Sequence, residues 1–323
     1  MLVPVLLFLL GLAFLIKGGD WFVDGATGIA KRFRIPEFLI GATVVSIGTT
    51  LPEVMVSATG ALGGQGEMAY GNAIGSVICN TALIAAITVT VAPSKVDKKT
   101  FRTPVLFFFV AAIFYSFIAY FYGAFSRLSG IILLLIFIIY MVHTVSSAVR
   151  TGRTLESEEA DKNVKNGRVR RDVLLLVMGA ALVAVGARLL VDNGTVIAKN
   201  LGVPESVIAL TFVAIGTSLP ELVTAITALV KGHGAVSLGN IVGANLLDLV
   251  LVSGLSVTLS PFSIPASKTV AGVNASLLID IPVMLFVMLL LTVPALLRGK
   301  LSRFQGILLL LVYTAFLAVQ FFV

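Results

Sequence analysis

Long runs of hydrophobic residues, separated by short polar stretches, repeat along the whole chain. Ten of these runs are long enough to cross a bilayer, because about 20 apolar residues in a helix span its hydrocarbon core. The longest polar stretch separates them into two sets of five. The pattern predicts an all-α polytopic membrane protein with ten transmembrane helices. They lie near residues 2–29, 37–62, 69–92, 103–122, 128–149, 172–198, 205–230, 236–259, 269–297 and 301–322.

The two sets of helices repeat one another in sequence. Val23-Asp24 recurs as Val191-Asp192, 168 positions later, and other short phrases recur at the same offset. Each set holds five helices, an odd number, so the second copy must enter the membrane upside down. We therefore expect two inverted five-helix repeats, residues 1–149 and 172–323, joined by a cytoplasmic linker over 150–171. Inverted repeats of this kind are typical of secondary transporters.

Composition and charge agree with a membrane protein. Hydrophobic residues form 58% of the 323-residue chain and charged residues only 12%, which excludes an ordinary soluble domain. The net charge of +7 is scattered over loops, so we expect the lipid bilayer as partner and no nucleic acid. Lys and Arg gather in alternate loops, and the other loops carry only Arg127, Lys199 and Lys268. The positive-inside rule then places both termini outside. No obligate protein partner is indicated.

Two acidic residues lie inside the predicted helices, within near-copies of one phrase. Glu53 ends Ile-Gly-Thr-Thr-Leu-Pro-Glu, and Glu221 ends Ile-Gly-Thr-Ser-Leu-Pro-Glu. An acidic residue at the centre of a membrane helix costs roughly 3 kcal/mol on insertion scales, so it usually marks a functional site. The proline before each glutamate also frees a backbone carbonyl one turn earlier. Both features indicate an oxygen-rich site within the membrane.

Further oxygen-bearing side chains accompany the two glutamates. Thr49 and Thr50 precede Glu53 by four and three positions, which places them on its face of a helix. The second copy supplies the corresponding hydroxyls, and the following helix of each half adds a second polar group. These additional residues are Thr217, Ser218, Ser76, Asn80 and Asp248, of which Asp248 is the repeat equivalent of Asn80.

An all-oxygen set of this kind suits hard cations. Ca²⁺ takes six to eight oxygen ligands, some of them carboxylates, in a flexible arrangement. The set contains no thiolate or imidazole, which argues against zinc or copper. The same oxygens, divided among smaller sites, could hold several Na⁺ ions. Ions that compete for shared glutamates can be exchanged, and Ca²⁺ and Na⁺ are then transported substrates rather than cofactors. No organic cofactor is expected.

The two glutamate phrases, together with Gly71-Asn-Ala-Ile-Gly-Ser76 and Gly239-Asn-Ile-Val-Gly-Ala244, resemble the α-repeats of the cation/Ca²⁺ exchanger superfamily. In length, layout and motif order the chain is similar to its prokaryotic sodium/calcium exchanger branch. The resemblance implies an antiporter of the prokaryotic cell membrane that works by alternating access, with the first and sixth helices as its moving elements.

The resemblance also implies roles for individual residues. Glu53 and Glu221 would coordinate Ca²⁺ together with Thr49 and Thr217. Asn80 and Asp248 would border a central position able to hold water. Flanking Na⁺ sites would use the side chains of Thr50, Ser218 and Ser76 and the backbone carbonyls of Ser46 and Ala214.

One departure from the family pattern keeps alternatives open. Ala244 stands where the family often has serine, so one Na⁺ ligand is missing and the Na⁺:Ca²⁺ ratio is not fixed. Exchange of Ca²⁺ for H⁺, or exchange that also requires K⁺, is the alternative, and a passive cation channel is a rival of a different class. The chain has no His-Glu-x-x-His pair and no serine–base arrangement, so we do not expect an enzyme.

Overall fold

A computed structural model describes the whole chain except residues 1, 157–166, 202–215, 267–268, 271 and 323. Within the described residues, nine helical segments are long and apolar enough to cross a membrane. They match nine of the ten predicted positions and confirm the predicted class. The remaining prediction, 205–230, falls partly outside the described residues, and its described part is a shorter apolar helix. The nine segments are Leu2–Arg32, Glu37–Leu62, Gly66–Val91, Lys98–Tyr122, Arg127–Ala148, Val169–Asn200, Gly234–Leu259, Ser276–Arg298 and Arg303–Gln320.

Several of these segments contain short stretches of wider π-helix, marked η. The first half is built from α1 (Leu2–Arg32), α2 (Glu37–Ile40), η1 (Gly41–Val45), α3 (Ser46–Leu62), α4 (Gly66–Cys79), η2 (Asn80–Ala85), α5 (Ala86–Val91), α6 (Lys98–Tyr122), β1 (Ala124–Phe125) and α7 (Arg127–Glu156). The second half is built from α8 (Gly167–Asn200), α11 (Leu219–Val230), α12 (Gly234–Leu247), η4 (Asp248–Val252), α13 (Ser253–Leu259), β2 (Phe262–Ser263), β3 (Thr269–Val270), β4 (Val273–Asn274), η5 (Ser276–Asp280), α14 (Ile281–Arg298) and α15 (Arg303–Phe322).

Local sequence signals explain where some helices begin and end. Asp97 caps α6 by accepting a hydrogen bond from the backbone N–H of Lys99. Gly123 and Gly299 end α6 and α14 in the left-handed conformation that glycine adopts without a steric penalty. α7 ends at Glu156 and α8 begins at Gly167, so both helices extend into the predicted linker over 150–171. The basic residues of this linker can continue a helix beyond the end of its apolar run.

The chain divides into two compact units, and each is described here by itself. Unit 1 contains residues 1–49 and 146–240, and unit 2 contains residues 50–145 and 241–323. Each unit therefore takes helices from both halves of the sequence. The repeat boundaries, which are defined by recurrence of sequence rather than by contact, stay a prediction.

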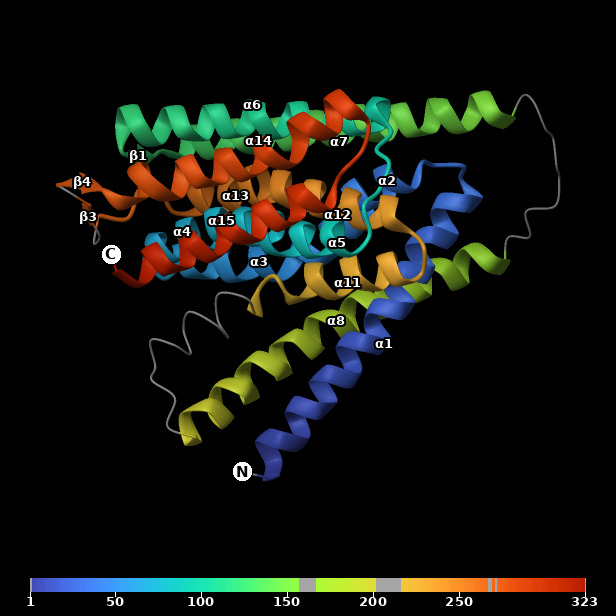
Figure 1. The fold of residues 1–323 in the computed structure, drawn as a ribbon, viewed down its shortest axis with the longest axis horizontal. Coiled ribbons are helices and arrows are strands. Elements are labelled where there is room, and N and C mark those ends of the chain that lie inside the picture. The colour runs from blue at the N-terminus through green and yellow to red at the C-terminus, as the bar shows by residue number, and fades with distance from the viewer. Residues whose placement is uncertain (1, 157–166, 202–215, 267–268, 271, 323) are drawn as a thin grey trace. The chain divides into compact units, whose positions relative to one another are not determined.

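In unit 1, the repeat-equivalent helices α1 and α8 pack against each other in antiparallel directions (Figure 1). A methyl group added at Gly11 would lie 2.9 Å from the carbonyl oxygen of Gly186, and one at Gly18 would lie 3.0 Å from that of Gly179. Gly179 and Gly186 are themselves the repeat equivalents of Gly11 and Gly18. When the two halves are exchanged, the contact of Gly11 with Gly186 becomes the contact of Gly179 with Gly18. This is the relationship expected of two inverted repeats.

Unit 2 shows the same exchange between different helices. Gly130 of α7 lies against Thr258 of α13, and Gly306 of α15 lies against Thr90 of α5. Thr90 and Thr258 are 168 positions apart, and the glycines are equivalent after a small insertion. Two short antiparallel strand pairs, β1 with β2 and β3 with β4, complete this unit.

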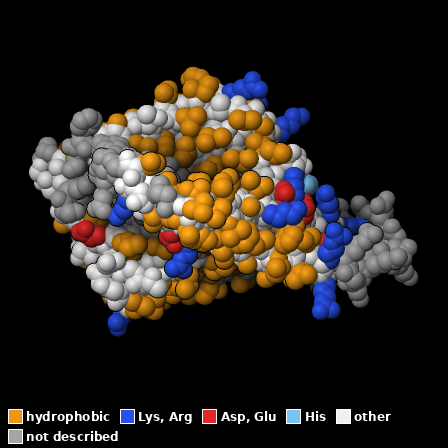
Figure 2. Space-filling view, turned by 90° about the horizontal axis from the view of Figure 1, so that it is seen from below, with side chains coloured by type: hydrophobic (Ala, Val, Ile, Leu, Met, Phe, Trp, Pro, Cys, Tyr) orange, Lys and Arg blue, Asp and Glu red, His pale blue; other side chains and the backbone are white. Residues whose placement is uncertain are grey.

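Large hydrophobic side chains are exposed along the long helices. On α7, Leu135, Ile138, Ile139 and Val142 are each at least half exposed and follow helical spacing, so they share one face. Hydrophobic side chains also cover much of the described surface seen in Figure 2, with Lys and Arg side chains in a few small groups. Such a surface is unfavourable in water and is expected of helices in contact with lipid.

Candidate cation site

The first glutamate motif lies within a continuous helix. α3 runs through Pro52, and the side chains of Thr49, Thr50 and Glu53 are each no more than 2% exposed. Ser46, at the start of α3, is fully buried. The proline supplies no N–H to the carbonyl one turn earlier, at Gly48, so this carbonyl is available to another partner.

The second copy of the motif folds differently, although its sequence is nearly the same. Thr217 and Ser218 form a turn, and α11 begins at Leu219 with Pro220 in its first turn. Proline is well tolerated there because the first N–H groups of a helix have no intrahelical acceptor. Glu221 then lies in the first turn of α11, where the helix dipole stabilises a carboxylate. Glu221 is 1% exposed, as is Glu53.

In unit 1, Asn240 connects Thr49 to α11. The hydroxyl Oγ1 of Thr49 donates to Oδ1 of Asn240 at 3.2 Å. The amide Nδ2 of Asn240 donates in turn to Oγ1 of Thr224 at 3.0 Å. Thr224 lies one turn after Glu221 on α11 and donates to the carbonyl oxygens of Pro220 and Glu221. Thr49 Oγ1 also lies 3.3 Å from the carbonyl oxygen of Ser46, so its single hydrogen has two acceptors and its lone pairs stay available.

In unit 2, the equivalent asparagine supports the other glutamate helix. Asn72 Nδ2 donates to Ser57 Oγ at 2.8 Å and to the carbonyl oxygen of Glu53 at 3.3 Å. Asn72 and Asn240 thus each contact the glutamate-bearing helix that precedes them in the chain. Sequence reasoning did not assign a role in the site to these two asparagines, nor to Ser57 or Thr224. The available signal was spacing, since each lies three or four positions after a glutamate.

A second polar pair of unit 2 lies where the η2 and η4 segments begin. Nδ2 of Asn80 lies 3.4 Å from Oδ2 of Asp248, and both side chains are buried. Ser253 Oγ donates to the carbonyl oxygen of Asp248. π-helical turns inside α-helices are frequent at functional sites, and here two of them start at repeat-equivalent residues. Asn80 and Asp248 therefore lie close together, and their place beside a central ion or water position stays a prediction.

The remaining predicted ligands can now be placed. Ser76 is buried in unit 2, Ser218 is buried in unit 1, and Thr217 is partly exposed in unit 1. Ala214 lies outside the described residues. Glu53 and Glu221 belong to different units, so their joint coordination of one ion stays a prediction. Among the described residues, no three His, Cys, Asp or Glu side chains form a metal-binding group, so any cation would rely on hydroxyl, amide and carbonyl oxygens as well.

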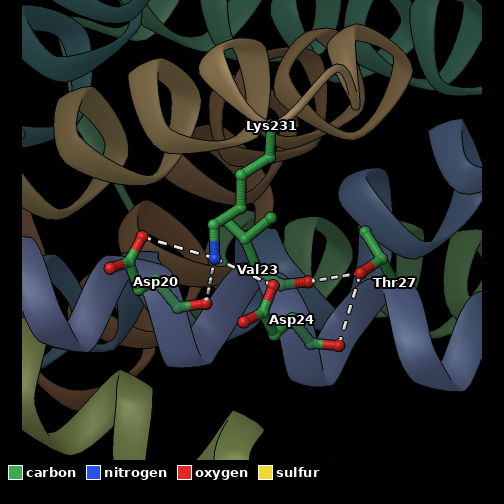
Figure 3. A network of polar contacts seen from close by, with 5 residues as sticks. All are labelled: Asp20, Val23, Asp24, Thr27 and Lys231. Atoms are coloured by element: carbon green, nitrogen blue, oxygen red, sulfur yellow. Dashed lines mark hydrogen bonds and ion pairs between the residues drawn. The ribbon is translucent and has the colours of Figure 1, made fainter.

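A separate ionic cluster ties the turn after α11 to α1 in unit 1 (Figure 3). Lys231 Nζ lies 2.8 Å from Oδ1 of Asp24, 3.3 Å from Oδ1 of Asp20 and 3.0 Å from the carbonyl oxygen of Asp20. Nearby in sequence, His233 Nδ1 lies 2.9 Å from Oε1 of Glu37. α1 is also paired with α8 through Arg32 and Asp172 at 3.0 Å. The Lys231 contacts join α1 to the end of the helix that carries Glu221, and the Arg32–Asp172 pair joins α1 to α8.

Comparison with known proteins identifies the family. The model of the sodium/calcium exchanger protein family matches residues 3–146 and 172–322, nearly the whole chain. The chain belongs to the sodium/calcium exchanger family. The family resemblance inferred from the repeated motifs is thereby confirmed.

Similar sequences occur in archaea and bacteria. The sodium/calcium exchanger MaX1 of Methanosarcina acetivorans is 31% identical over 99% of both chains. The uncharacterized membrane protein MJ0091 of Methanocaldococcus jannaschii is 37% identical over 95% of this chain and 94% of its own. The inner membrane protein YrbG of Escherichia coli is 34% identical over 87% of each chain.

Solved exchanger structures share the fold. The sodium-calcium exchanger NCX_Mj, soaked with Na⁺ and Ca²⁺, superposes with a TM-score of 0.80 at 34% identity and 98% coverage of both chains. A form of the same exchanger soaked without either ion gives a TM-score of 0.81. These matches agree with the all-helical architecture described above.

Proposed function

We propose that this protein is a secondary antiporter that exchanges Na⁺ for Ca²⁺ across a prokaryotic cell membrane by alternating access. The observation that carries the proposal is the repeated intramembrane carboxylate. Glu53 and Glu221 are both 1% exposed, 168 positions apart, and each lies among hydroxyl and amide groups. An ionised carboxylate buried at this depth needs a compensating positive charge, and a transported cation supplies one.

Charge balance explains why the two ions would exchange. Two glutamates neutralise one Ca²⁺, and Na⁺ ions can neutralise them after Ca²⁺ has left. If both ions use the same carboxylates, Ca²⁺ and Na⁺ cannot occupy the site together. Their summed positive charge would exceed the negative charge of the two glutamates, and the ions would repel each other strongly in a low-dielectric interior. Competition at one site, open to each side in turn, couples the two fluxes.

The proposed ligands divide into three groups. Ca²⁺ is held by Glu53 and Glu221 with the hydroxyls of Thr49 and Thr217. Na⁺ uses flanking positions, and Asn80 with Asp248 borders a central position that holds water. The Na⁺ ligands are Thr50, Ser218, Ser76 and the carbonyl oxygens of Ser46 and Ala214. The bonds from Thr49 to Asn240 and from Asn240 to Thr224 support this assignment, because they fix the orientation of a ligand hydroxyl.

We further infer a transporter rather than an enzyme, with both termini outside and the 150–171 linker in the cytoplasm. Lys and Arg crowd the loops that this orientation places inside. The lipid bilayer and the two ions suffice as partners, and no organic cofactor is required.

Ion flux in reconstituted vesicles tests the proposal. Purified protein is placed in liposomes loaded with Na⁺, the proton gradient is collapsed with an uncoupler, and uptake of radioactive Ca²⁺ is followed after dilution into Na⁺-free buffer. We expect uptake that requires the outward Na⁺ gradient and stops when Na⁺ is equal on both sides. Uptake that ignores the Na⁺ gradient would contradict the proposal.

A buried alanine favours a second candidate. Ala244, the repeat equivalent of Ser76, is fully buried and offers no hydroxyl to Na⁺. The glutamates could then be neutralised by protons, giving Ca²⁺/H⁺ exchange, or K⁺ could take part. The same vesicles separate these cases, because uptake would follow an imposed pH gradient in one and would need added K⁺ in the other. Large unitary currents in planar bilayers would instead indicate a cation channel.

A further inference from the structure

Asn80 and Asp248, which contact each other in unit 2, occupy equivalent positions in the two halves of the sequence. Each residue is the repeat equivalent of the other, so their contact maps onto itself when the halves are exchanged. Each position on one flank of this pair therefore has an equivalent position on the other flank. The two flanks should look alike wherever the halves share their chemistry.

The flanks differ in polarity. On one flank, Thr81 and Asn245 form a hydrogen bond between the helix of Asn80 and the helix of Asp248. The repeat equivalents of these two residues are Leu249 and Val77, whose side chains form no hydrogen bonds. All four side chains are completely buried. The bridge is thus polar on one flank, and the equivalent positions on the other flank are apolar.

The polar bridge has a well-defined geometry. Asn245 Nδ2 donates to Thr81 Oγ1 at 2.7 Å and to Met288 Sδ of α14 at 3.2 Å. Thr81 Oγ1 also donates to Met288 Sδ at 3.2 Å. Both amide hydrogens of Asn245 are therefore engaged, which sets the plane of its side chain. Met288 is fully buried, so the three side chains connect three helical segments out of contact with solvent.

We propose that Asn245 is a positioning residue for transport, and the proposal rests on the exchange function proposed above. The bond from Asn245 to Thr81 holds the Asp248 helix in register with the Asn80 helix. Support from this flank matters because the direct contact between Asn80 and Asp248 is long, at 3.4 Å, and both residues open π-helical segments. The short 2.7 Å bond fixes a register that the long contact alone defines weakly.

The consequence for transport concerns Na⁺ more than Ca²⁺. Asn245 acts through Asp248 and Asn80, which border the central position between the proposed Na⁺ sites. Within the part of the chain that the structure describes, its side chain donates to Thr81 and Met288, whereas Asn72 and Asn240 support the glutamate helices. Loss of the bridge should therefore weaken the response to Na⁺ while leaving Ca²⁺ binding nearly intact.

The test compares three variants in the Na⁺-loaded vesicle assay. Asn245→Ala removes the bridge, and Thr81→Val with Asn245→Leu replaces it by an apolar pair of similar size, as the other flank has. Thr292→Val is the matched control, since Thr292 is equally buried beside Met288 but bonds only within α14. The Na⁺ and Ca²⁺ concentrations that give half-maximal uptake are measured for each variant. Uptake by the wild type, measured in parallel, tests the exchange function itself.

We expect Asn245→Ala to raise the Na⁺ concentration for half-saturation roughly tenfold, equivalent to about 1.4 kcal/mol, with the Ca²⁺ value changed less than about twofold. The double variant should restore the Na⁺ value, because an apolar pair can hold the register, and the control should match wild type. A double variant as impaired as Asn245→Ala would overturn the proposal and show that the Asn245 oxygen meets an ion directly. If Asn245→Ala does not fold, the double variant alone decides, and a tenfold rise in its Na⁺ value contradicts the positioning role. Absence of Na⁺-driven uptake in the wild type would instead refute the exchange function.

Discussion

Thr49 and Asn240, which come from opposite halves of the sequence, are joined by a 3.2 Å hydrogen bond from Oγ1 to Oδ1. Asn240 passes this connection on to Thr224, one turn after Glu221. The hydroxyl proposed to bind Ca²⁺ is therefore oriented by a residue that does not bind it. Residues of this kind are often as important to a cation site as its ligands.

Replacement of Asn240 should weaken Ca²⁺ binding. In Asn240→Ala, Thr49 loses the acceptor that orients its hydroxyl, and we expect the Ca²⁺ concentration for half-maximal uptake to rise by about tenfold or more. Asn200→Ala is the control, because Asn200 is exposed and donates to the carbonyl oxygen of Val196 in its own helix. A variant with wild-type Ca²⁺ dependence would show that Thr49 is not oriented through Asn240.

Neutralising either glutamate should abolish Ca²⁺ transport without unfolding the protein. Glu53→Gln and Glu221→Gln keep side-chain size and one carbonyl oxygen but remove the charge that balances Ca²⁺. We expect uptake at background level and an unchanged elution volume in size-exclusion chromatography. Glu67→Gln, a change at an exposed position, should transport normally. Wild-type rates in either buried variant would remove the central assignment.

A hydroxyl restored at position 244 should strengthen Na⁺ dependence. Ala244→Ser recreates the group that Ser76 supplies in the first half, so half-saturation by Na⁺ should occur at lower concentration. Ala69→Ser places a hydroxyl at another buried alanine of unit 2 and should have no such effect. An unchanged Na⁺ response in Ala244→Ser would mean that this position is not a ligand.

Close packing of α1 on α8 should not tolerate a side chain at Gly179. A methyl group there would lie 2.4 Å from the backbone nitrogen of Phe22, and no change of rotamer relieves a clash with backbone. Overpacking of this kind costs about 1–3 kcal/mol, so Gly179→Ala should lower the apparent Tm in detergent. Gly60→Ala is the control, because its methyl group would meet Met68 Sδ at 3.5 Å and the carbonyl oxygen of Gln65 at 3.8 Å, both ordinary contact distances. Equal Tm values for the two variants would contradict the tight α1–α8 contact.

Removal of the Lys231 amine should loosen α1. Lys231→Met leaves Asp20 and Asp24 without this cation, and we expect faster backbone hydrogen exchange in the second half of α1. Arg188→Gln is the comparison, since Arg188 and Asp192 are exposed and pair within one helix, where such pairs contribute little. Exchange that is no faster than in Arg188→Gln would show that the Lys231 cluster does not restrain α1.

The architecture and the family could be predicted from the sequence. Apolar runs long enough to span a bilayer fix the number and place of the helices, because the membrane admits few alternatives. The offset of 168 positions and the odd number of helices in each half then require inversion. The repeated Pro-Glu pairs also mark a candidate site in the sequence, because a charged side chain in hydrocarbon is costly and usually serves a function.

Tertiary structure decided what the repeat alone predicted wrongly or not at all. Two nearly identical motifs lie in a continuous α3 and at the start of α11, and two equivalent flanks are polar at Asn245 and apolar at Val77. The partners of Asn240 and Asn245 depend on how helices are rotated and shifted against one another. Those rotations arise from the packing of side chains distant in sequence, so no local pattern specifies them.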